Sequence, residues 1–532
     1  MATYDLLIDN ALVVDGTGGP AYRGAVATKG GEIAAVGQVV GEATKRIDVA
    51  GQVVAPGFID LHTHSDLSFL LDHTAQSKVR QGVTLELAGN CGSSFCAPLY
   101  GAAREALQQR AAQYEQPLDV TWTDFAGYLD ALERARPALN VAVQVGHGTV
   151  RTCVLGMEAR APTDEELARM RALVAESLDA GAMGFSTGLY YAPGSYAQID
   201  EVVALAQPAA ARNKLYSSHL RDEADVSIGL FAALDEAIEV GRQTGVRVQI
   251  SHVKCAGPAV WGRAGDALAV YERSRRDGVD VAGDQYPYTA ASTSISGALF
   301  PRWALEGGRE PTLRRLADAA TRARIRAEIA DAFTKRSDAK GTVIARFVPE
   351  PRYEGMSLAA IAEAAGCDPA EAAIRLYEQR DGQVILHAMR EDDVATFAAH
   401  PLIAVGSDGS SLATDGVLAA GKPHPRSYGT NPRFLARFVR ERRLTSLEEA
   451  VRKMTALPAS RLGLTRRGRL APGFAADLVV FDSQTVADRA TFEEPHCYPA
   501  GIPYVAVNGV LVIEHGEFTG HTPGRVIRGF AE

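Results

Sequence analysis

The sequence predicts an α/β fold: a (β/α)8 TIM-like barrel with a small β-sandwich domain built from both chain termini. Apolar strand-like runs alternate with amphipathic helical stretches eight times between residues 56 and 465. Short strands with Gly-rich turns fill residues 1–55 and return in residues 466–532. The chain has 532 residues, which is long enough for a barrel of about 250 residues and further domains.

The composition is that of an ordinary globular protein, with 46% hydrophobic and 22% charged residues. A net charge of −9 and the lack of a basic run argue against nucleic acid or an anionic membrane as a partner, but not against one anionic small molecule held by a local cation. No apolar run approaches the roughly 18 residues of a membrane span, and the N-terminus lacks the features of a secretory signal. Six cysteines without paired spacing favour a reduced, cytoplasmic protein.

Both ends of the chain have the pattern of short strands. The N-terminal runs alternate with turns such as Asp15–Pro20, and an Asn-Gly pair at 508–509 between two apolar runs predicts a hairpin. Two unrelated end modules would give the same local pattern as one sandwich. The expected terminal strands are Asp5–Ile8, Leu12–Val14, Ala25–Thr28, Gly31–Val36, Gln52–Ala55, Ala476–Phe481 and Tyr504–Ile513.

Residues 56–465 supply the predicted barrel. Helical stretches lie between its strands, and Thr163 with Glu166 three residues later predicts a capping box at the start of one helix. A ninth run, Val384–Ala388, has the same apolar character, so the count is eight or nine. The region from about 300 to 385 is predicted to be an insertion before the last strand. The eight expected strands are Phe58–Leu61, Val83–Leu87, Asn140–Val145, Ala182–Phe185, Lys214–Ser217, Arg247–Ile250, Val279–Ala282 and Ile403–Gly406.

Most residues that can carry chemistry follow a predicted strand. Phe58–Leu61 leads into His62 and His64, whose side chains share a face because residues two apart in a strand do so. A lone His-x-His pair is weak evidence, but Cys, His and Asp also end four other strands. Active sites of α/β barrels lie at the carboxyl ends of the strands, and N, S and O ligands from separate strands suit zinc. The sequence therefore predicts a metal centre; its other members are Cys91, His219, His252 and Asp408.

The motifs around these residues also resemble a known family. Pro56–Ser65 is similar to the first-strand motif of the amidohydrolase superfamily, which hydrolyses amides and related bonds in a metal-bearing barrel beside a small β-sandwich. Seven further motifs resemble, more narrowly, the D-aminoacylase group, the N-acyl-D-amino-acid deacylases. The resemblance keeps motif order and covers nearly the whole chain, with the poorest match at about 300–385. The motifs are Gly89–Gly92, Phe185–Gly188, Ser218–Arg221, Ser251–Lys254, Tyr286–Tyr288, Ser407–Gly409 and His424–Gly429.

The resemblance implies one tightly bound zinc ion, with Cys91, His219 and His252 as its ligands. Many members of the superfamily place a carbamylated lysine at the fourth strand. No Lys occurs in Ala182–Gly188, whereas Cys91 stands where the D-aminoacylase group uses a thiolate. A thiolate and two imidazoles suit zinc and leave a fourth position open for water, whose pKa zinc lowers to about 7.

The same resemblance implies a second, weaker or transient metal position among His62, His64 and Asp408. Asp408 is also the candidate proton shuttle, which would take a proton from water and deliver it to the leaving amine. An Asx turn at the strand end is the alternative explanation for Asp408. The catalytic role is preferred because amide hydrolysis needs a shuttle, and this acid stands at the expected strand.

Several residues are candidates for substrate binding. Lys254 lies two residues beyond His252 and can share its face. In the D-aminoacylase group the matching lysine binds the substrate α-carboxylate together with the tyrosine that corresponds to Tyr286. Ser292 and Tyr191 match positions that contact substrate in the group. The alternative for Lys254 is a solvated loop residue.

Three more residues lie near the expected site. Arg221 could be a second ligand for an anion, or it could pair with Asp222 or Glu223. His424 and Arg426 follow Asp408 in a Pro-bounded loop, where we expect them to shape the rim of the site.

The resemblance therefore predicts a zinc-dependent hydrolase that removes the acyl group from N-acyl-D-amino acids, with Asp408 as proton shuttle and a small-molecule substrate as partner. The alternative within enzymes is a cyclic-amide hydrolase of the hydantoinase or dihydroorotase type. Cys91 in place of a carbamylated lysine weighs against it, as does a lysine directed at a free carboxylate. A catalytically silent barrel that acts as a binding protein is a further alternative, but every expected metal ligand is present.

Overall fold

The structure, a computed structural model, describes residues 3–112, 118 and 120–529. Within these residues, parallel strands form two adjoining sheets in the orders β6-β7-β8 and β9-β10-β11-β12-β13-β17. β9 (Val145–Gly146) continues almost directly from β8, and a parallel bridge between Thr63 and Gly409 joins the ends of β6 and β17, so the strands close into a barrel. They are β6 (Phe58–Asp60), β7 (Val83–Ala88), β8 (Asn140–Val143), β10 (Gly184–Gly188), β11 (Leu215–His219), β12 (Arg247–Ile250), β13 (Val281–Gln285) and β17 (Ile403–Val405).

The parallel strands agree with the predicted eight-stranded barrel, and the ninth candidate strand is wrong. Val384–Ala388 overlaps β16 (Gln383–His387), which pairs antiparallel with β14 (Ala290–Ser294) and β15 (Thr342–Arg346). β16 is buried on both faces, because Val384 and Leu386 pack in one apolar cluster and Ile385 in another. A strand that is covered on both faces has the continuous apolar sequence of a barrel strand.

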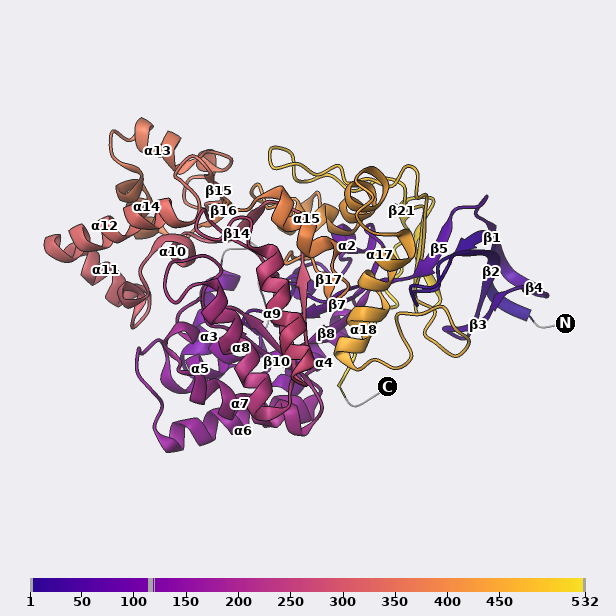
Figure 1. The fold of residues 1–532 in the computed structure, drawn as a ribbon, viewed down its shortest axis with the longest axis horizontal. Coiled ribbons are helices and arrows are strands. Elements are labelled where there is room, and N and C mark those ends of the chain that lie inside the picture. The colour runs from indigo at the N-terminus through magenta and orange to yellow at the C-terminus, as the bar shows by residue number, and fades with distance from the viewer. Residues whose placement is uncertain (1–2, 113–117, 119, 530–532) are drawn as a thin grey trace.

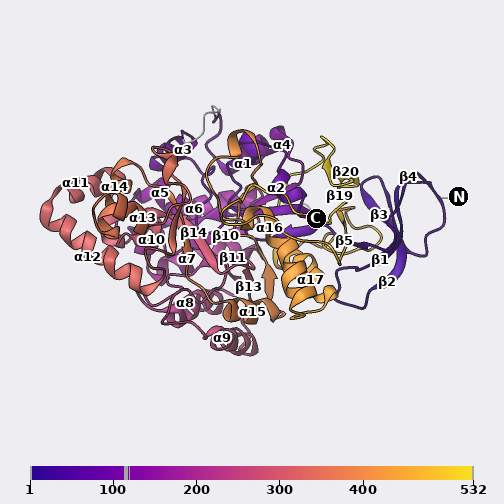
Figure 2. The ribbon, with the colours of Figure 1, turned by 90° about the horizontal axis from the view of Figure 1, so that it is seen from above.

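Residues 290–387, between β13 and β17, form a separate layer with its own apolar core. Its three strands carry helices on one side, and Figures 1 and 2 show these elements at the end of the molecule opposite to β1–β4. The four longer helices are α11 (Arg309–Ala317), α12 (Ala319–Lys335), α13 (Leu358–Ala364) and α14 (Pro369–Gln379). We call residues 290–387 the insertion.

Strands from both termini share one nine-stranded sheet, in the order β21-β20-β19-β18-β5-β1-β2-β3 with β4 beside β1. The terminal halves meet where β5 pairs antiparallel with β18, so the single β-unit is confirmed and two unrelated end modules are wrong. Asn508 and Gly509, with φ of 49° and 81°, form the predicted turn between β19 and β20. The strands are β1 (Thr3–Val13), β2 (Tyr22–Lys29), β3 (Glu32–Gly37), β4 (Glu42–Asp48), β5 (Val53–Pro56), β18 (Leu478–Phe481), β19 (Tyr504–Val507), β20 (Val510–Glu514) and β21 (Glu517–Phe518).

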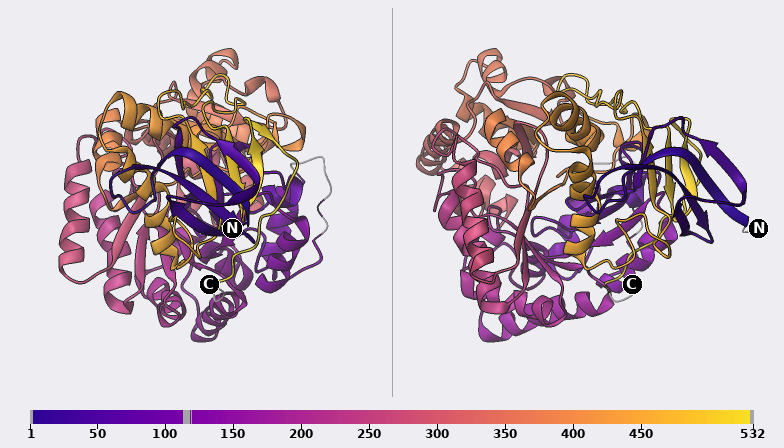
Figure 3. Two further views of the ribbon diagram at one scale, coloured as in Figure 1. Left: turned by 90° about the vertical axis from the view of Figure 1, so that its right-hand side faces the viewer. Right: turned by 45° about the vertical axis from the view of Figure 1, so that its right-hand side comes forward.

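Helices surround the barrel strands, as Figure 3 shows. α6 begins with the predicted capping box, in which the Thr163 hydroxyl accepts a hydrogen bond from the Glu166 backbone and the Glu166 carboxylate accepts one from the Thr163 backbone. No helix in the described ranges is long and apolar enough to span a membrane. The barrel helices include α4 (Phe125–Ala135), α5 (His147–Leu155), α6 (Asp164–Ala180), α7 (Ile199–Ala211), α8 (Leu230–Thr244), α9 (Ala264–Arg276), α15 (Glu391–Ala399) and α17 (Leu447–Met454).

Candidate metal centre

The six side chains predicted to bind metal converge at the carboxyl ends of the barrel strands. Their donor atoms form two groups, and within each group all donor atoms lie within 4.8 Å of one another. Cys91 belongs to both, because its Sγ lies 3.3 Å from Nε2 of His62 and 3.3 Å from Nε2 of His252. The structure therefore places two overlapping sets of donors around one thiol. The first set is His62, His64, Cys91 and Asp408, and the second is Cys91, His219 and His252.

The backbone is unusual at three of these residues. Cys91, His252 and Asp408 have φ values of 54°, 36° and 52°, in a region that residues other than glycine rarely adopt. Such strain persists only where the surrounding structure imposes it, and it is common at functional sites. Gly188 packs against the backbone of Cys91 and has to be glycine, because a Cβ there would lie 2.0 Å from the Cys91 carbonyl oxygen. The strand ends are thus shaped to bring the donors together.

Two carboxylates that the sequence analysis missed orient the histidines. Oδ1 of Asp284 lies 2.9 Å from Nδ1 of His62, and Oε1 of Glu223 lies 3.1 Å from Nδ1 of His252. A carboxylate on the outer nitrogen of a metal-binding histidine fixes the ring and leaves the inner nitrogen for the metal. Asp284 lies in barrel strand β13 and Glu223 follows His219 by four residues, so a search for acids beside the predicted ligands could have found both.

The environment of Cys91 and Asp408 favours their ionised forms. Burial opposes ionisation of the Cys91 thiol, but the charges of His252 and His62 hold its pKa well below its usual value. Burial also opposes ionisation of Asp408, but the Arg426 guanidinium and His252 hold the pKa of that carboxyl well below its usual range. Thiolate and carboxylate are the forms that bind a metal cation.

His219 gives an independent test of whether a metal fits these residues. Both of its ring nitrogens are buried and have no hydrogen-bond partner among the residues that the structure describes. Burial lowers the pKa of the ring, so the imidazole is neutral and can offer a lone pair. Buried polar atoms are normally satisfied, and an orphaned one calls for a partner. A thiolate and neutral imidazoles are the donors that zinc prefers, so the residues fit this metal.

Arg426 is wrongly placed by the sequence analysis, which assigned it to the rim. Its Nη1 lies 2.7 Å from Oδ2 of Asp408, and its guanidinium carbon lies 4.9 Å from the centre of the Tyr286 ring. Asp408 in turn contacts His64, whose Nε2 lies 3.0 Å from Oδ1. The candidate proton shuttle is therefore held between a cation and an imidazole in the interior.

The predicted substrate-binding residues gather around the histidines. Lys254 is 4% exposed, so its alternative as a solvated loop residue is wrong, and its Nζ lies 2.6 Å from Glu223 Oε1. The same Nζ lies 5.7 Å from the centre of the Tyr286 ring, whose buried hydroxyl has no partner in the described ranges. The Tyr191 ring lies 4.8 Å from that of His219. Ser292, on β14, accepts a hydrogen bond at its carbonyl from the guanidinium that pairs with Asp408.

Arg221 pairs with a different residue from either predicted partner. Its Nη2 lies 2.8 Å from Glu236 Oε1, and the guanidinium also donates to carbonyl oxygens of the loop at 195–197. The predicted pairing with Asp222 or Glu223 is wrong. The reason is helical geometry: α8 brings Glu236 back over the strand end, which local sequence does not reveal. We infer that Arg221 anchors the 195–197 loop.

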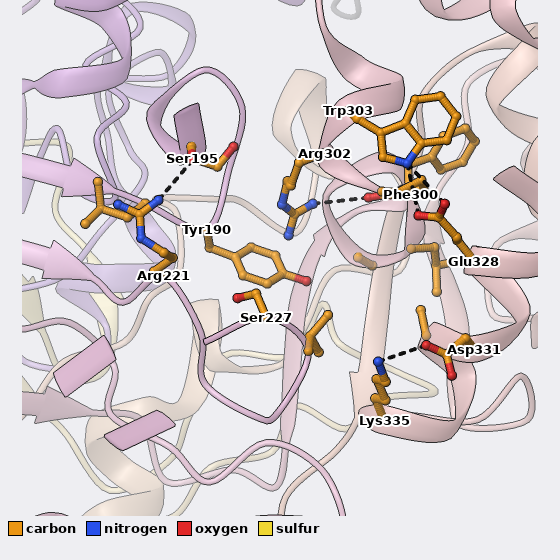
Figure 4. A pocket seen from close by; sticks show the side chains of 16 residues that line it. Tyr190, Ser195, Arg221, Ser227, Phe300, Arg302, Trp303, Glu328, Asp331 and Lys335 are labelled. Carbon is orange, nitrogen blue, oxygen red and sulfur yellow. Dashed lines mark hydrogen bonds and ion pairs between the residues drawn. The ribbon is translucent and has the colours of Figure 1, made fainter. Parts of the chain in front are cut away.

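A cavity of about 380 Å³ lies between the barrel and the insertion. Tyr190 borders both this cavity and the candidate metal centre, because it lines the cavity and its ring stacks on that of His219 at 5.5 Å. The Arg302 guanidinium carbon lies 4.0 Å from the centre of the Tyr190 ring. Figure 4 shows Tyr190 and Arg302 on one side of the cavity and the Lys335–Asp331 ion pair on the other.

Arg302 differs from the other cations that line this cavity. Lys335 pairs with Asp331, and Arg221 pairs with Glu236. Arg302 donates to the carbonyl oxygens of residues 297 and 300 and lies against the Tyr190 ring, and no carboxylate in the described part of the chain pairs with it. The cavity lining therefore contains a guanidinium without a carboxylate partner, although Glu328 and Asp331 line the same cavity.

Comparisons with known proteins show which family this chain resembles. The model of the "Amidohydrolase family" matches residues 45–513. An N-acyl-D-glutamate deacylase of Alcaligenes xylosoxydans xylosoxydans is 42% identical over 527 residues, covering 98% of this chain and 96% of the relative. A D-aminoacylase of the same organism is 38% identical over 528 residues, covering 98% and 97%.

Solved structures also resemble this chain over nearly its whole length. The crystal structure of an N-acyl-D-glutamate deacylase from Bordetella bronchiseptica, complexed with zinc and a phosphonate inhibitor that mimics the tetrahedral intermediate, is 39% identical with a TM-score of 0.83. It covers 99% of this chain and 100% of its own. The structure of a D-hydantoinase shares only the fold, with 15% identity and a TM-score of 0.54 over 98% of this chain and 100% of its own.

Proposed function

The chain belongs to the amidohydrolase family, and on that premise we propose that it is a zinc-dependent hydrolase that removes the acyl group from N-acyl-D-amino acids. The observation that carries the proposal is the shared thiol: Cys91 completes both donor sets. Strand β10 (Gly184–Gly188) contains no lysine that could be carbamylated, which disfavours a hydantoinase-like centre. The relatives that match nearly the whole chain are deacylases of N-acyl-D-amino acids by name.

We assign the tight zinc to Cys91, His219 and His252, and a second, weaker position to His62, His64 and Asp408. Zinc bound there supplies a Lewis acid for the amide carbonyl and lowers the pKa of water. Asp284 and Glu223 hold the rings of the two histidines that contact the thiol. The oriented rings and the ionised thiol are the contribution of this chain, and they are in place before substrate arrives.

Asp408 is the proposed proton shuttle. Its carboxylate is ionised at neutral pH and can take a proton from the attacking water. It then delivers this proton to the nitrogen of the leaving amine, which would otherwise depart as an unstable anion. Arg426 and His64 contact the carboxylate on either side and hold it in one orientation for proton transfer.

Two groups around the site are suited to the α-carboxylate of the substrate. Lys254 is the proposed ion partner, and the unpartnered hydroxyl of Tyr286 is the proposed hydrogen-bond donor beside it. The two residues lie on one side of the donor cluster, next to Arg426. A carboxylate bound here satisfies the Tyr286 hydroxyl, which carries a desolvation cost while it is unpaired. Tyr191 and Ser292 are the proposed walls of the acyl and amino-acid subsites.

We place the side chain of the substrate in the cavity beside Tyr190 and infer a preference for an acidic side chain. Arg302 supports this preference, because it is the lining cation without a carboxylate partner among the described residues. The 42% identity to an N-acyl-D-glutamate deacylase points the same way. We also place the enzyme in the cytoplasm, because none of its six cysteines is in a disulfide and free cysteines are typical of reducing compartments.

The test is a substrate screen with the released amine as readout. The panel contains N-acetyl derivatives of D-glutamate, D-aspartate, D-leucine and L-glutamate, together with hydantoin. We expect the highest kcat/KM for an acidic D-amino acid and no ring opening of hydantoin. Preferred hydrolysis of hydantoin would establish the cyclic-amide alternative, and zinc-replete protein without any hydrolysis would favour a silent binding protein.

A further inference from the structure

A long connection links the terminal β-sheet to the catalytic side of the molecule. Residues 482–503, between β18 and β19, contain no helix and no strand. Figure 1 shows this yellow loop running from the terminal sheet along the barrel toward the insertion. Loops longer than about 12–15 residues without secondary structure are uncommon in compact domains, and they usually have a function. We call residues 482–503 the C-terminal strap.

The tip of the strap packs on three elements at the rim of the site. The Phe492 ring lies 5.0 Å from the ring of His424, at an angle of 78°. It also lies 4.9 Å from His387, which ends β16 of the insertion, and 6.5 Å from Tyr288 of the Tyr-Pro-Tyr motif. Edge-to-face contacts of this kind fix the orientation of both rings.

His424 connects this contact to the proton shuttle. Its Nδ1 accepts a hydrogen bond from the backbone N–H of Arg426 at 3.0 Å, and its Nε2 donates to the carbonyl of Ala290 at 2.9 Å. Arg426 pairs with Asp408 at 2.7 Å. Phe492, His424, Arg426 and Asp408 thus form a continuous series of contacts.

Two more contacts clamp the strap to the same loop. Asp488 pairs with Arg433 at 3.1 Å, at the end of α16 (Arg426–Arg433). His496 lies 2.8 Å from the Tyr428 hydroxyl and 3.0 Å from the carbonyl oxygen of Gly421. The strap therefore holds the segment of residues 421–433, which carries Arg426, from both sides of Phe492.

We propose that the C-terminal strap positions Arg426 against Asp408, and that Phe492 is its positioning residue. The terminal β-sheet thereby contributes to the geometry of a site that lies on the barrel. Neither Phe492 nor any other strap residue touches the metal ligands in the described contacts, so the effect passes through His424 and Arg426. The kinetic consequence rests on the proposed deacylase function, whereas the structural consequence does not.

The kinetic test compares two phenylalanines on zinc-loaded full-length protein. Phe492→Ala is expected to lower kcat/KM by about 10-fold, the value of a lost ring contact of this size. Phe518→Ala makes the same change on β21 of the terminal sheet, away from His424, and is expected to leave kcat/KM within about 2-fold of wild type. Phe492→Tyr keeps the ring and should restore activity. Equal losses in Phe492→Ala and Phe518→Ala would overturn the proposal.

A double-mutant cycle separates positioning from a general structural role. If Phe492 acts through Arg426, the loss caused by Phe492→Ala is expected to shrink from about 10-fold to about 2-fold in an Arg426→Lys background, because coupled residues are not additive. Two additive losses would show that the strap acts elsewhere, which contradicts the proposal.

A second readout needs no activity. Amide hydrogen exchange of the peptide covering residues 422–430 reports the Arg426 N–H bond to His424 directly. We expect exchange at least about 10-fold faster in Phe492→Ala and unchanged in Phe518→Ala; Phe492→Leu serves in the same comparison if Phe492→Ala does not fold. Unchanged exchange overturns the proposal. An inactive wild type contradicts the proposed function instead, and the exchange result still decides the role of the strap.

Discussion

Two buried polar clusters lie close together in the barrel, and they differ in how well their atoms are satisfied. In the cluster between β6 and β17, the Lys78 ammonium contacts the Asp60 carboxylate at 2.7 Å and the Ser407 hydroxyl at 2.6 Å. Asp60 also accepts hydrogen bonds from the backbone of His62 and Ser407. Glu86 is satisfied in the same way by the hydroxyls of two serines. We call Asp60, Lys78, Glu86 and Ser407 the closed cluster.

The candidate metal ligands at the strand ends, with Lys254 and Tyr286, form a second cluster, which we call the open cluster. Both nitrogens of His219 and the hydroxyl of Tyr286 are buried without a hydrogen-bond partner in the described structure. Three of its residues have positive φ values, whereas no residue of the closed cluster does. A satisfied buried network serves to hold the fold, and an unsatisfied one on a strained backbone indicates a binding site. The comparison thus distinguishes buried charged residues that stabilise the fold from buried charged residues that form the candidate site.

Asp408→Asn tests the function of the open cluster and has the largest expected effect. We expect kcat to fall by about 10²–10⁴-fold because proton transfer is lost. Zinc in the Cys91 set should change little, since Asp408 is not among the donors of that set. The free energy of unfolding should fall, because asparagine leaves the buried Arg426 guanidinium without its anion. Metal analysis and steady-state kinetics check this. Loss of zinc in step with activity would make Asp408 chiefly a ligand and would remove the proton-shuttle role.

Lys78→Met tests the closed cluster. Removal of one partner of a buried ion pair leaves Asp60 uncompensated, and we expect the free energy of unfolding to fall by about 3–5 kcal/mol. The activity of the fraction that remains folded should stay near that of wild type. Denaturant unfolding gives the first quantity, and active-site titration with a tight inhibitor gives the second. A stable variant with reduced turnover would show that the closed cluster is functional, and the comparison would fail.

Lys254→Met tests the open cluster at its proposed carboxylate site. We expect kcat/KM for an N-acyl-D-amino acid to fall by an amount equivalent to about 2–4 kcal/mol, the usual effect of leaving a charge without its partner. The matching amino amide, which has no carboxylate, should be affected far less. Arg221→Met is the comparison variant, because both cations pair with a buried or half-buried glutamate but Arg221 also donates to the 195–197 loop, where we infer an anchoring role. An unchanged preference for acid over amide would remove Lys254 from substrate recognition.

Arg302→Met has the smallest expected effect and tests whether the cavity binds an acidic side chain of the substrate. Arg302→Met should lower kcat/KM for N-acetyl-D-glutamate by about 10-fold or more, since a charge-assisted hydrogen bond contributes about 1.5–3 kcal/mol. N-acetyl-D-leucine should be hydrolysed as well as before or better. The ratio of the two kcat/KM values is the measurement. If both substrates lose activity equally, Arg302 has a structural role and the side-chain preference lies elsewhere.

The sequence predicts the parts of the site that depend on local pattern. His62, His64, Cys91 and the other candidate ligands could be found because each follows an apolar run, and the carboxyl ends of barrel strands meet by topology. The fold class follows from the same alternation. Val384–Ala388 misled, because a strand buried on both faces has the same sequence pattern in any sheet. Strands β4, β14, β15 and β21 were not predicted.

The missed residues depend on packing between distant segments. Arg426 reaches Asp408 only after its loop has folded back over the barrel. Glu236 returns along α8 to neutralise Arg221, and Arg336 of the insertion contacts Glu223 at 3.2 Å. None of these partners is fixed by spacing along the chain, because each pair is set by tertiary contacts between separate elements.

The central claim is that Cys91 unites the open cluster into a zinc site, and the most direct measurement is zinc content after gentle purification. Cys91→Ala is compared with Cys96→Ala, which alters a fully buried cysteine five residues away that is not among the candidate ligands. We predict about one tightly bound zinc per chain in wild type and Cys96→Ala, and almost none in Cys91→Ala, which should also lack turnover. Stoichiometric zinc and normal turnover in Cys91→Ala would contradict the account.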